Sequence, residues 1–211
     1  MRLNYIPTPA AVAGFGRLIN GYAIMDSRNI APAGWHIPSN VEWSTLFTTI
    51  SPSGGGKIKE MGYTHWLSPN TGATNMYGFN CVGAGFRKEI YDFLLLRFDC
   101  WFWSSTWVSG YNQAFVISFN SDLPAVGNLI YTSGGSLRCI KDNSTDTGSV
   151  TGNDGTVYPT VKIGDQVWMA QNSVETKYRD GSVIPEVRDY TAWIGLTSGA
   201  WCYPNNNASN L

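Results

Sequence analysis

The chain has 211 residues and carries 14 Lys and Arg against 15 Asp and Glu, which gives a formal net charge of −1. This balance excludes a protein that binds nucleic acid or a membrane surface through clustered positive charge. Aromatic residues make up 14% of the chain, and 23 Gly and 10 Pro accompany them, so the composition favours strands and turns over a helix bundle. No apolar run approaches the roughly 18 residues that a membrane span requires.

The first predicted element is a helix of about three turns that starts at Ser39. Ser39 and Glu42 have the spacing of a capping box, in which each side chain accepts the other residue's backbone N–H. An apolar stripe follows: Val41, Leu46, Phe47 and Ile50. Pro52 and the glycines at 54–56 are predicted to end the helix. The stretch before it is broken by prolines and glycines and lacks the long apolar core of a signal peptide.

Strands are predicted in the second half of the chain. Residues 63–85 are rich in Asn, Gly, Ser and Thr and are predicted to form a long loop. Short strands are then expected at residues 100–104, 113–119 and 136–140. Farther along, a hairpin is expected over 156–170, with its turn at Gly164-Asp165.

Neither the histidines nor the cysteines form a catalytic or metal-binding pattern. His36 and His65 each lie beside a tryptophan, which favours packed or hydrogen-bonded rings. The sequence contains no nucleophile elbow, P-loop or paired-cysteine zinc motif, and Asp154 lacks the acidic spacing of an EF-hand. We therefore expect no enzyme activity, no cofactor and no metal. The four cysteines are expected to be buried thiols, with one bridge, such as Cys139 to Cys202, left open.

Several motifs along the chain resemble one known family. They read APAGWHIPSNVEW at 31–43, THW at 64–66, SPNTGATN at 68–75, WSST at 103–106 and SLRCIKD at 136–142. This set is similar to the Fibrobacter succinogenes major paralogous domain. The family's opening hairpin also occurs, but downstream, as DGTVY at 154–158 and VKIGDQVWMAQN at 161–172.

The resemblance implies an α+β, C-type-lectin-like fold that is circularly permuted and has long irregular loops. Residues 1–142 would form its main part, 143–155 a linker, and 156–211 a permuted hairpin block that completes the same domain or a neighbouring copy. The lectin-like scaffold is related to the formylglycine-generating enzyme, yet the chain has neither a Glu-Pro-Asn or Gln-Pro-Asp sugar motif nor that enzyme's cysteine pair. The scaffold therefore implies display of a binding surface.

One segment departs from the family pattern. Where the relatives carry Gly, Asn, Ser and Tyr, residues 88–100 read KEIYDFLLLRFDC. Apolar side chains such as Leu95 and Phe98 in a surface loop reduce solubility unless they bind something. From Ile90 to Tyr131 there is no Lys, Glu or Met and one Gln. Most of the residue types present are reached by randomising the first two bases of Asn codons, among them Ile, Tyr, Asp, Leu, Arg, Phe, Cys, Val, Ser, Asn and Pro. This pattern resembles the target of a diversity-generating retroelement.

These observations favour a non-enzymatic module that binds a receptor through a variable face. The predicted contact residues are Ile90, Tyr91, Asp92, Leu94, Leu95, Arg97, Phe98, Asp99, Phe102, Trp107, Val108, Tyr111, Asn112, Val116, Ser118, Asn120 and Asp122. The first hypothesis is a phage tail- or head-fibre protein on the virion surface, a homo-oligomer with a trimer favoured, whose partner is a host cell-surface protein or glycan. The alternative is a bacterial cell-surface adhesin or glycan-binding module, and an enzyme on the formylglycine-generating scaffold is a third, weaker reading.

Overall fold

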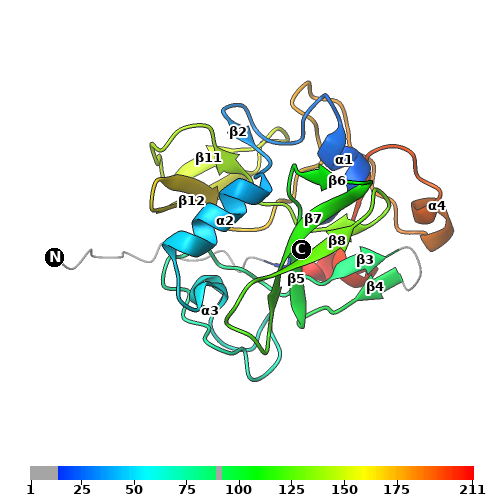
Figure 1. Cartoon of the computed structure of the whole chain (residues 1–211). Coiled ribbons are helices and arrows are strands. Elements are labelled where there is room, and N and C mark those ends of the chain that lie inside the picture. The colour runs from blue at the N-terminus through cyan, green and yellow to red at the C-terminus, as the bar shows by residue number, and fades with distance from the viewer. Residues whose placement is uncertain (1–13, 89–91) are drawn as a thin grey trace.

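The computed structural model describes residues 14–88 and 92–211 (Figure 1). Its helices are α1 (Gly21–Met25), α2 (Asn40–Thr49), α3 (Gly54–Ile58) and α4 (Tyr190–Ile194), with short 3-10 turns at Pro204–Asn206 and Ala208–Asn210. Its strands are β1 (Leu18–Asn20), β2 (Trp35–His36), β3 (Phe86–Lys88), β4 (Asp92–Leu94), β5 (Asp99–Phe102), β6 (Trp107–Val108), β7 (Tyr111–Ser118), β8 (Ala125–Leu129), β9 (Gly134–Gly135), β10 (Ile140–Lys141), β11 (Ser149–Thr151), β12 (Val157–Ile163), β13 (Gln166–Met169) and β14 (Trp201–Cys202).

These strands pair antiparallel in three hydrogen-bonded sets. The first has the order β14-β1-β9-β3-β4, the second β11-β12-β13-β10-β2, and the third consists of β5, β6 and β8 around β7. Isolated bridges from Gly85 to Cys100 and from Phe102 to Ser136 join the first set to the third. The result is two curled antiparallel half-barrels.

The expected α+β, C-type-lectin-like fold is wrong. The structure is mostly β, and only 16% of it is helical. Of the α-helices among residues 14–88 and 92–211, α2 is the only one longer than five residues. The glycine-rich and aromatic-rich composition explains the outcome, because such residues favour turns and pleated surfaces over helices.

Helix α2 begins where the sequence predicted. Ser39 is its N-cap, and the capping box with Glu42 is confirmed. The predicted apolar stripe is only partly correct, because Leu46 and Ile50 are fully buried and Phe47 is partly buried, whereas Val41 is 74% exposed. The glycines expected to end α2 instead form the start of α3.

The aromatic side chain of Trp43 is the centre of the core beneath α2. Its ring lies 4.7 Å from that of Trp168 on β13, 5.1 Å from Phe102 on β5 and 5.6 Å from Phe115 on β7. Helix α2 therefore lies between the β11–β12 side of the molecule and the β5–β7–β8 sheet, as Figure 1 shows. The Trp side chains expected in the core, Trp35, Trp43, Trp103 and Trp168, are all buried.

The last third of the chain packs against earlier strands. The hairpin predicted at Gly164-Asp165 is confirmed, with Ile163 opposite Gln166. Strand β13 also pairs with β10, and β10 pairs with β2. Residues 143–155, expected to be a linker, contain β11, which pairs with β12. Strand β14 pairs with β1 near the other end of the described chain.

None of the helices in the described ranges is both long and apolar enough to cross a membrane.

Candidate recognition surface

The segment that departs from the family pattern forms a strand and a tight turn. Strand β4 pairs with β3, and the chain then reverses over residues 95–98 before entering β5. Backbone N–H groups of Phe98 and Asp99 both donate to the carbonyl oxygen of Leu95, at 2.9 and 3.0 Å. We call residues 95–98 the recognition turn. Two predicted contact residues, Ile90 and Tyr91, lie outside the described residues.

Both the backbone and the side chains of this segment are in unfavourable states. Asp92, Leu95 and Arg97 have φ angles of 57°, 61° and 67°, in the left-handed region that bulky residues rarely adopt. Leu95 is also 38% exposed and Phe98 41% exposed. Strained backbone persists where surrounding contacts fix it, and it concentrates at functional sites.

Arg97 provides one of these fixing contacts. Its guanidinium donates to the carbonyl oxygens of Tyr63 and Trp66, at 2.5 and 3.2 Å. Its backbone N–H donates to Gly83, and its carbonyl oxygen accepts from Leu67. Arg97 therefore anchors the recognition turn to the long loop at 63–85, while Leu95 and Phe98 remain exposed.

A second turn, at residues 118–121, lies directly beside the first. The Phe119 N–H donates to the Phe98 carbonyl oxygen at 2.7 Å, and the two phenyl rings meet edge to face at 5.1 Å. The Lys59 ammonium, from a fully buried side chain, donates to carbonyl oxygens of Ser118 and Ser121, each at 2.9 Å. Burial lowers the pKa of Lys59 to about 8. The paired turns are thus held from beneath by a buried cation.

The acidic residues of the segment also have internal roles. Asp92 accepts from Nε of Arg87 at 2.7 Å, and that guanidinium is fully buried against the ring of Trp193. Asp99 lies opposite Ser118 on the neighbouring strand, and burial raises its pKa. Arg87 holds strand β4 in place through this ion pair.

Three predicted contact residues are instead part of the core. Phe102 and Asn112 are fully buried, and Val116 is 6% exposed. The reason is that both faces of the β5–β7 sheet are covered. Helix α2 packs on one face, and on the other Val116 lies opposite Trp101 of β5, whose ring packs against Phe86. The Asn112 amide binds the backbone of Ser104 within the loop before β6. We exclude these three side chains from the surface.

The remaining predicted residues do not form one patch. Trp107 and Val108 form β6, which pairs with the start of β7 at Tyr111. The recognition turn lies at the far end of β7, because Asp99 pairs with Ser118. Eight residues of β7 separate the two groups, a distance of about 23 Å along a strand. Beside the recognition turn, Asn120 is exposed, and Leu94, Ser118 and Asp122 are partly buried.

Sequence reasoning missed two residues of this surface. Phe119 is the last residue of the strand predicted over 113–119 and is not among the predicted contact residues, yet its ring contacts Phe98 and is partly exposed. Leu123 is 60% exposed in the loop that follows the second turn. Both residues lie in the Lys-free window from Ile90 to Tyr131. The unusual composition of that window is the sequence signal that could have pointed to them.

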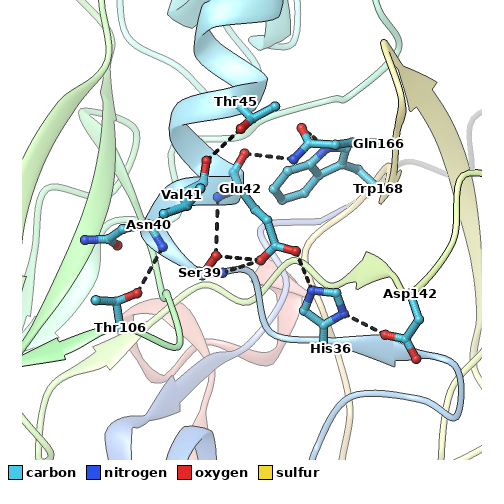
Figure 2. A network of polar contacts seen from close by, with 10 residues as sticks. All are labelled: His36, Ser39, Asn40, Val41, Glu42, Thr45, Thr106, Asp142, Gln166 and Trp168. Carbon is cyan, nitrogen blue, oxygen red and sulfur yellow. Dashed lines mark hydrogen bonds and ion pairs between the residues drawn. The ribbon is translucent and has the colours of Figure 1, made fainter.

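A network of polar side chains lies at the start of α2 (Figure 2). His36 Nδ1 lies 2.6 Å from the Asp142 carboxylate, and Nε2 lies 2.7 Å from that of Glu42. The other oxygen of Glu42 accepts from the Ser39 hydroxyl at 2.7 Å. Burial opposes protonation of His36, but the hydrogen bonds with Asp142 and Glu42 outweigh it and raise its pKa.

Because both ring nitrogens point at carboxylates, the imidazolium form of His36 fits this site best. It connects β2, α2 and the end of β10. Gln166 adds β13 by donating to the Glu42 carbonyl oxygen at 2.9 Å. We interpret this group as a polar latch, defined as His36, Ser39, Glu42 and Asp142.

The other residues considered as possible catalytic groups or metal ligands, His65 and Asp154, make hydrogen bonds with neighbouring residues. His65 Nδ1 lies 2.8 Å from Glu60, and its ring meets Phe15 edge to face. Asp154 accepts hydrogen bonds from Thr156 and Thr176. Within residues 14–88 and 92–211 no group of three or more His, Cys, Asp or Glu side chains is placed to hold a metal ion.

The sequence matches the model of a known protein family. The family model of the Fibrobacter succinogenes major domain (Fib_succ_major) matches residues 2–141. The chain belongs to this family. The Fib_succ_major match includes the recognition turn and three of the four polar latch residues, His36, Ser39 and Glu42, and it ends at the last residue of β10, one residue before Asp142. No curated protein and no solved structure is detectably similar to the chain.

Proposed function

We propose that this Fib_succ_major protein is a non-enzymatic display module whose recognition turn binds a receptor. The observation that carries the proposal is the combination of Leu95 and Phe98 exposed on a strained, anchored turn. Exposed apolar side chains and left-handed backbone each cost stability. A bound partner supplies the compensating gain.

The anchoring of the turn supports this function. Arg97 and Lys59 fix both turns through backbone carbonyl groups, so little conformational freedom is left to lose on binding. Aromatic and aliphatic anchors on a rigid frame are the usual centres of binding energy at interfaces.

Binding to intact cells tests the proposal. The purified domain, multimerised on beads, is incubated with a panel of bacterial cells, and retention is measured for the parent, Leu95→Ser, Phe98→Ser and Val41→Ser. Val41 is an exposed apolar residue on α2 and serves as the matched control. We expect both turn variants to lose at least tenfold in retention while Val41→Ser keeps it. Equal retention of all four proteins, or no retention by the parent on any cell, contradicts the proposal.

We further propose a phage virion surface as the location, with the chain as a fibre subunit, a trimer favoured, and a host cell-surface protein or glycan as partner. Repetition around a fibre raises weak single-site affinity through avidity. The retroelement-like composition of residues 90–131 supports this context. Sequencing codons 88–131 in many independent isolates tests it. Substitutions concentrated at the exposed turn residues support a diversified face, and a window no more variable than the rest of the gene contradicts it.

The alternative proposal is a bacterial surface adhesin or glycan-binding module. It requires the same surface but a fixed sequence. Protease treatment of the target cells and competition with free sugars separate the two partner classes, because a glycan receptor survives protease and a protein receptor does not.

We also propose that the chain is a circularly permuted member of its family. The order of motifs supports this, since the opening hairpin at 154–172 follows the closing motif at 136–142. The Phe15 N–H donates to the Asn210 carbonyl oxygen at 2.8 Å, so these two segments are adjacent. A chain reordered to run from 149 to 211 and then from 14 to 143 is expected to fold with the parent's near-ultraviolet circular dichroism. Loss of that spectrum contradicts the proposal.

A further inference from the structure

One surface arginine differs from the others in its polar contacts. Arg17, directly before β1, is partly exposed, and no carboxylate or carbonyl oxygen of residues 14–88 and 92–211 accepts a hydrogen bond from its guanidinium, whose Nε is buried without a partner. The other arginines in these ranges each donate to a carboxylate or a carbonyl oxygen: Arg28, Arg87, Arg97, Arg138, Arg179 and Arg188. The guanidinium of Arg17 is therefore free to bind an oxygen atom of a ligand.

Aromatic rings fix the position of the Arg17 guanidinium. Its Cζ lies 4.1 Å from the centre of the Trp201 ring and 5.9 Å from that of Tyr203. The two rings meet edge to face at 5.2 Å, and Trp201 Nε1 donates to the Ile184 carbonyl oxygen at 2.9 Å, which holds the indole in place. A guanidinium stacked on an aromatic face keeps the N–H groups at its edge free to bind an anion. The donor is thus oriented before any ligand arrives.

The site carries one positive charge without a partner. A second guanidinium, that of Arg188, lies 5.2 Å from the centre of the Tyr203 ring, but it is paired with the Glu186 carboxylate. The charge left over on Arg17 matches a singly charged carboxylate, which a guanidinium binds through two parallel N–H···O bonds. A doubly charged phosphate group would leave one of its charges unmatched.

The residues around Tyr203 favour a ligand that also carries hydroxyl groups. Tyr203 is partly exposed, and Asn205, in the turn that follows it, is exposed with a left-handed φ of 52°. Asn206 donates to the Arg188 carbonyl oxygen at 2.8 Å and so fixes this turn. An amide side chain donates to one hydroxyl and accepts from another, and the C–H face of a sugar ring packs on an aromatic ring. A sugar acid therefore fits these groups better than an acidic peptide.

We propose that Arg17, Tyr203 and Asn205 form a binding site for an acidic sugar of the hexuronic acid class. The sugar carboxylate binds the terminal nitrogens of Arg17, its ring packs against Tyr203, and its hydroxyl groups bind the Asn205 amide. The site goes beyond the proposed function, because β14, which carries Trp201, and β4, which leads to the recognition turn, are opposite edges of one sheet.

Titration with a uronic acid oligomer tests the proposal. Trigalacturonic acid or its methyl ester is added to the full, isotope-labelled chain, and the NMR signals of arginine Nε–Hε groups and backbone amides are followed. We expect the acid to shift the signals of Arg17 and of residues 201–205 saturably, and the uncharged ester to leave them unchanged. Binding should weaken by about tenfold or more in Arg17→Gln, which lacks the charge, and in Arg17→Lys, which lacks the planar fork. Arg28→Gln, at an arginine already paired with Asp26, is the control and should bind like the parent.

Other outcomes overturn the proposal. No saturable shift, equal binding of the acid and its ester, or equal binding by the parent and Arg17→Gln each contradict the site. A glutamate-rich peptide that binds Arg17 more tightly than the sugar acid contradicts the assignment to a sugar. If Arg17→Gln does not fold, the comparison of acid and ester on the parent protein still decides the question. Leu95→Ser should bind the acid like the parent, so failure of this site and failure of the recognition turn are distinguishable.

Discussion

The polar latch and the paired turns are each organised around one cation, but the two cations are compensated in opposite ways. His36 lies between two carboxylates, and the hydrogen bonds that it makes raise its pKa. Lys59 donates to neutral carbonyl groups, and burial lowers its pKa to about 8. The carboxylates in contact with His36 stabilise the start of α2. Lys59 beneath the turns has only carbonyl groups in hydrogen-bonding contact, and its attraction to Asp122 does not outweigh the cost of burial. The polar latch thus contributes to stability, whereas the contacts of Lys59 fix the shape of the paired turns.

The largest expected effect concerns the core beneath the latch. Trp43→Ala removes a fully buried ring that contacts Trp168, Phe102 and Phe115, and should reduce the free energy of unfolding by about 3–5 kcal/mol. Urea unfolding followed by circular dichroism measures this loss. Met25→Ala, at an exposed position, is the control and should change it little. A loss as small as that of the control would mean that α2 does not organise the core.

The second prediction concerns the buried charge of Lys59 and the pH dependence of stability that it causes. With a folded pKa of about 8 and an unfolded value of 10.5, Lys59 binds its proton more weakly in the folded state. Stability should therefore rise as pH increases from about 8 to 10.5. Relative to Lys59→Met, the parent protein should gain about 2–3 kcal/mol between pH 7 and pH 10 in urea unfolding. A pH-independent difference in stability between the two proteins would show that folding does not lower the pKa of Lys59.

The third prediction, for His36, has a pH dependence opposite to that for Lys59. Because the pKa of His36 is raised in the folded state, its stabilisation is present below pH 6.5 and is lost as pH rises through the folded pKa. The side chain is 39% exposed, so solvent screening limits the effect to below about 1 kcal/mol. The melting temperature of the parent should exceed that of His36→Gln at pH 5.5, and the gap should close by pH 9. A difference in melting temperature that widens with pH would contradict the interpretation of this group as a polar latch.

The smallest expected effect on stability is at the recognition turn. Leu95→Ser replaces a partly exposed side chain and should change the free energy of unfolding by less than about 0.5 kcal/mol. Thermal melts of Leu95→Ser and of the control Val41→Ser, run beside the parent, check this. A large drop confined to Leu95→Ser would place Leu95 in the core and remove the basis for a binding role.

Local features of the fold could be predicted from sequence more readily than its class. The capping box of Ser39 and Glu42 and the turn at Gly164-Asp165 depend on neighbouring residues, and both are confirmed. The fold class depends on how very short strands such as β2, β9 and β10 find distant partners, and such strands are too short for periodicity to be visible. The resemblance to a lectin-like scaffold therefore supplied an architecture that the strands do not follow.

The candidate surface illustrates the same limit. The unusual composition around Leu95 and Phe98 identified an exposed apolar turn, which the structure places at the surface. It could not show that Val116 is covered or that Tyr111 lies at the far end of β7, because strand register is set by tertiary packing. Nor could it show that Lys59, far away in sequence, lies beneath the turns.

The pairing of β14 with β1 and of β13 with both β12 and β10 has a consequence for how the protein is made. As the ribosome extends the nascent chain, β1, β2 and β10 emerge long before the strands that complete their sheets. Until residues 166–202 emerge, these earlier strands expose open edges, which invite pairing between neighbouring nascent chains. Closure of these sheets should therefore be delayed until residues 166–202 have emerged, and slowed elongation before codon 202 should increase aggregation.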